Sequence, residues 1–440
     1  MKIRLSISLF FVLTTSIVVA QEQWSLERCI SYALENNINI RQQQLNVEYQ
    51  KNICEQTNYS ALPSVNASID QSFSLGRSLG QDNSYINNNV STTSFNVSAN
   101  VVLFQGLAKY NQRKVSKLDC EAAIQNLEYA KNNVSINVTS AYLDVLFNKE
   151  LLKIAQEQLL ITQEQIALSK QQVDLGTLSE GKLLELESQL ANEELDVINS
   201  ENNLWLSLVA LQQMLELPIT NNFDIVQPQF DTELKMSALI TVDTIYTKAV
   251  EERPEIKSKK FAVEGASKKI AIAKAQQYPS ISMSAGYRNY YYSMAEGNNA
   301  AFSDQFDVNG TKFIGATLNI PIFNGKSART NVKNSIIYHQ NSLLELQESK
   351  NILLKEIEQS YVNATAAIKR YFSCQKSVSS CQMSFDYARE KYDLGVITSF
   401  EYNEAKNRLT TAKLTFIQAK YDYLFKLKIL EFYYYNKLEI

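Results

Sequence analysis

The chain is poor in the residues that interrupt regular structure, and it contains a single histidine. Twelve glycines and six prolines in 440 residues are few for the roughly three compact domains that this length would otherwise suggest. The one histidine, His339, excludes most histidine-based catalysis and histidine-ligated metal sites. A formal net charge of −3 gives no electrostatic basis for wrapping nucleic acid. We therefore expect long uninterrupted elements in a protein that is not an enzyme, has no catalytic residues, cofactor or metal, and binds no nucleic acid.

The first twenty residues have the features of a secretory signal peptide. Lys2 and Arg4 form a positive start, an apolar stretch opens with Leu5–Val12, and Ala20 supplies the small residue before a cleavage point. Residues 1–20 are therefore predicted to be removed. Beyond them no apolar run reaches about 18 residues, the length that a membrane-spanning helix requires. The pattern indicates an exported protein that either stays soluble or enters a membrane through β-strands.

The chain has the pattern of an internal duplication. Ala33–Ile40 aligns with Ala249–Ile256, and Leu103–Gly106 aligns with Ile322–Gly325 at nearly the same offset. Each half is therefore expected to form the same helix-strand-strand-helix repeat. The predicted organisation is a first repeat at 21–217, a connecting segment at 218–240 and a second repeat at 241–440.

Each half contains two stretches in which apolar and small polar residues alternate. About ten residues per stretch, with one apolar face and one face rich in Ser and Asn, match transmembrane β-strands. A soluble sandwich with the apolar face inward is the alternative, although four strands make a poor sandwich. The apolar series are Val65, Ala67, Ile69, Phe73 and Leu75; Phe95, Val97, Ala99, Val101 and Leu103; Ile281, Met283, Ala285 and Tyr287; and Ile314, Ala316, Leu318, Ile320 and Ile322.

Outside the strands, apolar residues recur every seven positions. The first series is interrupted at Lys131 and its counterpart at Lys350, so even the exception is repeated. Heptads sustained over this length indicate coiled-coil helices, and helices of roughly 65 residues would each be about 100 Å long. Turns are expected at Gly176 and Gly395. The predicted fold class is mainly α with a small β part: a long coiled-coil α-helical barrel plus four transmembrane β-strands per subunit.

The strands and the helices constrain each other. Four strands cannot close a barrel, and an open sheet edge is not tolerated in lipid. Several copies are therefore expected to pool their strands in one β-barrel, with the helices aligned beneath it as a cylinder. The predicted product is a membrane pore that continues into a helical conduit. The alternative is a secreted coiled-coil structural or adaptor protein without a pore, whose strands would close a soluble domain.

The same layout resembles the TolC-type outer-membrane efflux channels of Gram-negative bacteria. The resemblance implies a homotrimer with a twelve-strand barrel in outer-membrane lipid and an α-helical tunnel across the periplasm. It also implies two partners, a periplasmic adaptor protein and an inner-membrane efflux or secretion transporter, including transporters of type I secretion. The motifs that carry it, in order, are Trp24–Glu27, Tyr32–Asn37, Arg253–Ile256, Pro321–Gly325, Tyr392–Gly395 and Ala419–Tyr423.

The resemblance places the functional residues at the periplasmic tip of the tunnel, where acidic side chains ring the aperture. The family pattern maps these acids onto Glu401 and Glu404, and Glu185 is the repeat counterpart of Glu404. Carboxylates from three subunits near one axis would favour cations over anions. Tyr392 matches a tyrosine that helps hold the tip closed in the family. Its acidic partner is replaced here by Lys182, so that bond cannot form as it does in the family.

Five cysteines are present, at positions 29, 54, 120, 374 and 381. Their odd number excludes a fully paired set, and no CxxC motif occurs. We expect them to be small, buried residues of the helices.

Overall fold

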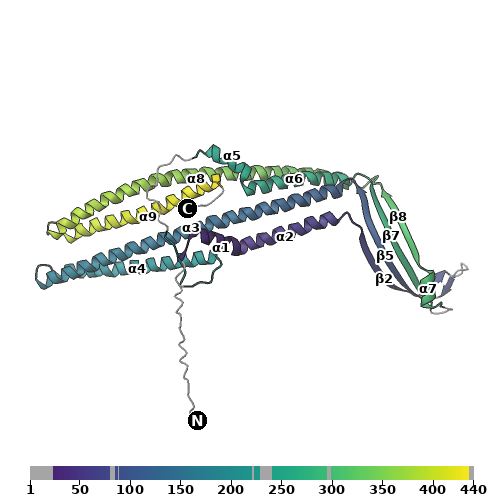
Figure 1. Cartoon of the computed structure of the whole chain (residues 1–440), viewed down its shortest axis with the longest axis horizontal. Coiled ribbons are helices and arrows are strands. Elements are labelled where there is room, and N and C mark those ends of the chain that lie inside the picture. Colours follow the sequence, from purple (N-terminus) through teal and green to yellow (C-terminus); the bar gives the residue numbers. More distant parts are fainter. Residues whose placement is uncertain are drawn as a thin grey trace, which may run out of the picture. The chain divides into compact units, whose positions relative to one another are not determined.

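The computed structural model of the protein describes residues 23–79, 85–87, 89–220, 222–227, 240–294 and 299–435. The predicted signal peptide and most of the predicted connecting segment lie outside these residues. The described chain is mainly helical with a few strands (Figure 1). It forms two compact units, and both halves of the sequence contribute to each. The sheet unit comprises 42–130 and 246–356, and the hairpin unit comprises the described residues of 1–41, 131–245 and 357–440.

The sheet unit contains one antiparallel sheet with the strand order β2-β5-β7-β8. The strands are β2 (Ser64–Ser74), β5 (Val90–Gln105), β7 (Ser280–Met294) and β8 (Thr311–Asn319). All four lie where the alternating pattern predicts strands. β2 and β8 form the two edges, and every residue of β2 is exposed. Among the described residues, therefore, the sheet has two open edges.

The register of the ladder sorts the side chains into two faces. Phe95 pairs with Asn289, and Ala285 pairs with Ile314, so the predicted apolar series share one face, here called the apolar face. Ser, Asn and Thr side chains dominate the opposite, polar face. Ile69 and Ile314 on the apolar face are 70% and 72% exposed. An apolar face this exposed is not the core of a soluble sandwich.

The last predicted members of the apolar series depart from the simple alternation. A bulge between Val102 and Phe104 turns Phe104 to the face on which Leu103 was expected. β8 ends at Asn319, and the following Pro321 has no backbone N–H to give to a ladder. The expected positions 320 and 322 therefore lie beyond the strand.

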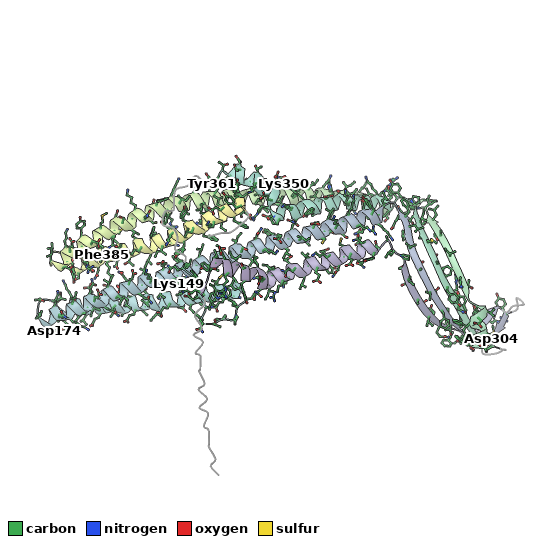
Figure 2. The ribbon with its side chains drawn as sticks, in the orientation of Figure 1. Lys149, Asp174, Asp304, Lys350, Tyr361 and Phe385 are labelled. Atoms are coloured by element: carbon green, nitrogen blue, oxygen red, sulfur yellow. The ribbon has the colours of Figure 1, made fainter. Side chains whose placement is uncertain are left out.

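The connections at the outer end of the sheet contain short elements that the sequence pattern did not predict. The β2–β5 connection includes the hairpin strands β3 (Arg77–Leu79) and β4 (Tyr85–Asn87). The β7–β8 connection includes a short helix, α7 (Phe302–Val308). Figure 2 labels Asp304 of α7 at this end of the sheet. One connection thus contains a strand hairpin, whereas the other contains a helix.

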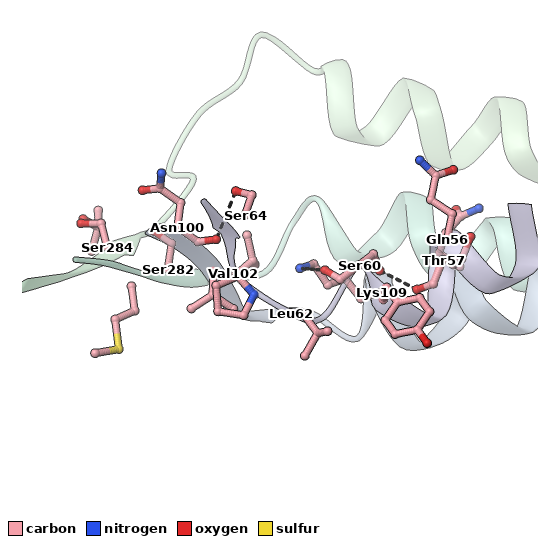
Figure 3. A pocket seen from close by; sticks show the side chains of 16 residues that line it. Gln56, Thr57, Ser60, Leu62, Ser64, Asn100, Val102, Lys109, Ser282 and Ser284 are labelled. Atoms are coloured by element: carbon pink, nitrogen blue, oxygen red, sulfur yellow. Dashed lines mark hydrogen bonds between the residues drawn. The ribbon is translucent and has the colours of Figure 1, made fainter. Parts of the chain in front are cut away.

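Helices join the opposite end of the sheet. The helices that lead into strands at this end are α2 (Ile38–Tyr59) and α6 (Pro254–Ala275), and α5 (Val242–Glu252) precedes α6. Gly106 lies at the junction with φ +56°, and a Cβ there would stand 3.0 Å from the Cα of Ala275. Lys109 Nζ donates to the carbonyl oxygen of Ser60 at 2.6 Å. A groove of about 800 Å³ lies beside this junction, lined mainly by polar side chains of the helices and of the polar face (Figure 3).

The longest helices are α3 (Ala108–Asp174) and α8 (Ser327–Asp393), each of 67 residues. In the hairpin unit each turns back into a second helix, α4 (Glu180–Met214) and α9 (Ser399–Tyr435). The predicted heptad positions supply much of the buried core, which confirms the coiled-coil pattern. Buried heptad residues include Val138, Val145, Ile166, Leu211, Ile357, Ala364, Tyr371, Phe385, Tyr402, Leu409, Tyr423 and Leu430.

The beginning of the described chain is fixed to the hairpin unit. Strand β1 (Gln23–Trp24) pairs in parallel with β6 (Asp224–Ile225), just before α1 (Leu26–Asn36). The Tyr142 hydroxyl lies 2.6 Å from the carbonyl oxygen of Val226 and 3.2 Å from that of Trp24. All five cysteines are free, and only Cys29 is fully buried. Burial was expected for all five, and it holds in full for Cys29 alone.

Within the described ranges, no helix combines the length and the hydropathy needed to cross a membrane.

Candidate functional site: the hairpin tips

The two helical hairpins of the hairpin unit turn with the same backbone geometry. Gly176 and Gly395 have φ angles of +70° and +71°, which glycine adopts without a steric penalty. Thr177 N donates to Gln172 O at 2.9 Å, and Val396 N donates to Lys391 O at 2.8 Å. These bonds close Schellman motifs that satisfy the last carbonyl groups of α3 and α8. Figure 2 labels Asp174 at the end of the first hairpin.

Glu401 is held in place by the start of α9. Its Oε2 accepts hydrogen bonds from the backbone N–H of Thr398 at 2.8 Å and from the Thr398 hydroxyl at 3.0 Å. The Glu401 N–H donates back to Thr398 Oγ1 at 3.3 Å. This reciprocal pattern is a capping box, and its two bonds from Thr398 lower the pKa of the Glu401 carboxyl. Glu401 is therefore a fixed, ionised carboxylate at the tip.

Glu404 carries its own counter-charge. Arg408, one turn along α9, donates from Nη2 to Glu404 Oε1 at 2.6 Å, and both side chains are well exposed. An exposed pair at this spacing contributes little to stability. It nevertheless places a positive charge beside the predicted acidic position. The i, i+4 spacing was visible in the sequence, but Arg408 was not among the predicted site residues.

Tyr392 makes its ring contacts inside its own hairpin. Its ring centroid lies 4.8 Å from that of Tyr402, which in turn packs 5.4 Å from Phe385. Lys182 and Glu185 lie exposed on the first turns of α4. The structure thus brings Tyr392 into an aromatic cluster of α8 and α9, with Lys182 and Glu185 on the other hairpin.

A buried polar link between the two hairpins was not predicted from the sequence. Lys406 on α9 is 1% exposed, and its Nζ donates to Thr162 Oγ1 on α3 at 2.6 Å and to Glu193 Oε1 on α4 at 3.1 Å. Gln189 also donates to Glu193 Oε1, at 2.9 Å. Burial lowers the pKa of Lys406, and Glu193 opposes that shift. The one available signal was the position of Lys406 between the buried heptad residues 402 and 409.

A second link between the hairpins involves the aromatic cluster. Burial raises the pKa of Tyr402, and the side chain of Gln165 on α3, which lies beside the tyrosine hydroxyl, opposes that shift. Tyr402 therefore joins Tyr392 to the first hairpin indirectly. Together, Lys406 and Tyr402 tie the second hairpin to the first close to the turns.

The chain belongs to the outer membrane efflux protein family, whose pattern matches residues 29–216 and 245–432. Outer membrane protein TolC of Escherichia coli (strain K12) is 22% identical over 379 residues, covering 82% of this chain and 72% of TolC. Toxin and drug export protein A of Aggregatibacter actinomycetemcomitans is 20% identical over 331 residues, covering 75% of this chain and 69% of that protein. A crystal structure of CusC has a TM-score of 0.78 and 20% identity, covering 93% of this chain and 91% of CusC.

The protein is therefore an outer-membrane efflux channel, as the resemblance implied. Its family is one of channel proteins. The fold is that of the known channel-tunnels, mainly helical with a small strand part. The alternative of a secreted adaptor without a pore receives no support from these comparisons.

Proposed function

We propose that the protein works as a homotrimer in which three copies of the sheet close one twelve-stranded barrel. The observation that carries this proposal is the open sheet: β2 and β8 are edges, and the apolar face is exposed. β2 and β8 run in opposite directions along the sheet order. The β8 edge of one subunit therefore meets the β2 edge of the next as an antiparallel pair, which leaves no unpaired edge in lipid.

Each subunit in this proposal arises from a duplicated gene segment and begins after a signal peptide. The element bounds support the duplication, because α3 and α8 have the same length and the turns at Gly176 and Gly395 share one geometry. The proposed repeats remain 21–217 and 241–440, joined by 218–240. The proposed signal at 1–20 directs export to the periplasm.

The hairpin tips form the proposed periplasmic aperture of the tunnel. Glu401, Glu404 and Glu185 supply carboxylates from each subunit, and Arg408 reduces the net field of Glu404. Cation preference then depends chiefly on Glu401, whose capping box keeps it ionised, and on Glu185. Tyr392 contributes to closure of the aperture through the aromatic cluster and not through a direct bond to the residue at position 182.

The channel is proposed to receive its cargo from an inner-membrane transporter through a periplasmic adaptor. The relatives support an export role, since one is named a toxin and drug export protein. The protein acts as a passive conduit in this scheme, with direction and choice of cargo set by the transporter.

Assembly and conduction test the proposal together. The protein purified from outer membranes in mild detergent is expected to have a protein mass of three mature chains in light scattering. The same preparation should form long-lived, cation-preferring channels in planar bilayers. Recovery of the mature chain as a monomer in the soluble periplasmic fraction would contradict the proposal.

A further inference from the structure

The short helix α7 packs on the apolar face of the sheet. Its Phe302 and Phe306 rings stack with centroids 5.6 Å apart. Phe306 lies 5.8 Å from Phe95 of β5, and Phe302 lies 5.3 Å from Tyr291 of β7. The ladder register places Phe95 and Tyr291 on the apolar face. α7 therefore covers the outer end of the same face that carries the exposed aliphatic residues.

Side-chain amides take the place of a strand beside the outer part of β7. β8 pairs with β7 only as far as Arg288, so the backbone of β7 beyond that residue needs other partners on this side. Three amides around α7 supply them, with bonds of 2.7 to 2.8 Å: Gln305 with N and O of Tyr292, Asn299 with N and O of Met294, and Asn309 with O of Tyr290. The helix is therefore anchored to the strand by a row of hydrogen bonds.

α7 also shields a polar residue on the apolar face. Asn289 lies opposite Phe95 in the ladder and is 0% exposed. Its Nδ2 donates to the carbonyl oxygen of Phe306 at 2.6 Å and to the Tyr287 hydroxyl at 2.9 Å. An amide facing hydrocarbon without partners is strongly unfavourable. With α7 in place, Asn289 presents no free donor toward that face.

The outward surface of α7 combines apolar and charged groups. Phe302, Phe306 and Val308 are 50%, 37% and 81% exposed, and the carboxylates of Asp304 and Asp307 are exposed beside them. Aromatic and polar groups mixed in this way are typical of the boundary between hydrocarbon and headgroups. The position at the outer end of the sheet matches that boundary.

We propose that α7 is a membrane-interface helix that lies in the headgroup region of the outer leaflet and ends the lipid-contacting zone of the sheet. The ligand is the lipid surface, because the exposed side of α7 continues the apolar face that Ile69 and Ile314 present. The inference rests on the proposed barrel, in which that face meets lipid. It adds a function for the β7–β8 connection, because closure of the barrel does not by itself require this connection to contact lipid.

Depth-dependent fluorescence quenching tests the proposal in the full-length channel reconstituted into vesicles. Tryptophan is introduced by Phe302→Trp, and separately by Val308→Trp, which alters a side chain that is almost fully exposed. The native Trp24 and Trp205 lie in the hairpin unit, and the emission of the parent channel is subtracted. Lipids brominated near the headgroup should then cause a larger loss of fluorescence than lipids brominated near the bilayer centre.

Two controls separate this inference from the proposed barrel. Ile314→Trp on the apolar face should be quenched by bromolipid, and Thr317→Trp on the polar face should not. If Ile314→Trp is not quenched, the barrel proposal fails. If it is quenched while both α7 variants respond only to aqueous acrylamide, α7 lies in solvent and the inference is wrong. If the α7 variants are protected from both quenchers, a neighbouring subunit covers α7, and the lipid assignment is likewise overturned.

Discussion

The ammonium group of Lys406 lies 2.6 Å from the hydroxyl oxygen of Thr162, although the two residues belong to different hairpins. The carboxylate of Glu193 completes the contact at 3.1 Å. A lysine this deeply buried is unfavourable unless its charge is paired and hydrogen-bonded. Both partners of Lys406, Thr162 on α3 and Glu193 on α4, belong to the first hairpin. The contact therefore joins α9 to both helices of the first hairpin.

Removing the lysine should destabilise the hairpin unit strongly. Lys406→Met leaves the carboxylate of Glu193 buried without its cation, and we expect a loss of about 3–5 kcal/mol in the free energy of unfolding. Denaturant unfolding followed by circular dichroism measures the change. The double variant with Glu193→Met should recover much of the loss, because no unpaired charge remains.

The pair between Lys426 and Asp422 on α9 provides a control for that measurement. It has the i, i+4 spacing, and its side chains are 33% and 29% exposed. Lys426→Met should cost only about 0.5 kcal/mol. Equal losses in the free energy of unfolding for Lys406→Met and Lys426→Met would show that the buried Lys406 contact stabilises the protein no more than a partly exposed ion pair does.

The two charges of the Glu404–Arg408 pair should shift ion selectivity in opposite directions. Arg408→Gln exposes the full field of Glu404, so the preference for potassium over chloride should rise, whereas Glu404→Gln should lower it. Reversal potentials in planar bilayers under a salt gradient measure both effects, and low ionic strength enlarges them because screening is weaker. Lys51→Gln, at an exposed site on α2, is the charge-matched control. Identical potassium-over-chloride selectivity in the two tip variants would show that this pair does not lie at the aperture.

The capping box should make the first turn of α9 sensitive to acid. Because the pKa of Glu401 is lowered in the folded protein, its stabilising contribution is complete above the ordinary glutamate pKa of about 4.3 and is lost as the pH falls through the lowered value. Hydrogen exchange of the Thr398 amide, corrected for intrinsic rates, should therefore accelerate in strong acid. Glu401→Gln keeps the capping geometry without the charge, so its protection should not change over that range.

The glycine at the second hairpin turn should not tolerate a side chain. Gly395 has a φ of +71° with open space around it, so Gly395→Ala is expected to cost about 1 kcal/mol through backbone strain alone. Gly181 lies within α4, also in open space and without a positive φ. Gly181→Ala should instead stabilise by about 0.5–1 kcal/mol. Thermal unfolding compares the two variants. A change of the same sign in both unfolding temperatures would contradict the conclusion that Gly395 is required for its positive φ.

The sequence was sufficient to predict the long helices and the four strands of the sheet, because the spacing of the apolar residues shows which of them share a face. Val138 and Ile357, at predicted heptad positions, are fully buried, and the alternating residues around Phe95 and Ala285 share one face of the sheet. Each of these features depends on neighbours close in sequence or on a repeating pattern.

Features that depend on distant segments were not predictable in the same way. Lys406 becomes buried because α3 and α4 bring Thr162 and Glu193 to it. Its position between Tyr402 and Leu409 indicates a buried face of α9 but does not identify these partners. α7 forms in a connection of ordinary polar composition, where seven residues are too few for a clear helical period. Its position is fixed by amide contacts with a strand rather than by its own pattern.

The equal length of α3 and α8, 67 residues each, restricts how the protein can change by insertion and deletion. One residue added to α9 between Ser399 and Lys406 would rotate the lysine by about 100° around the helix axis and carry it away from Thr162. Length changes in the helices are therefore expected in whole heptads and in both of the proposed repeats at once. The connections at the outer end of the sheet are free of this restriction, and natural variation in chain length should collect there.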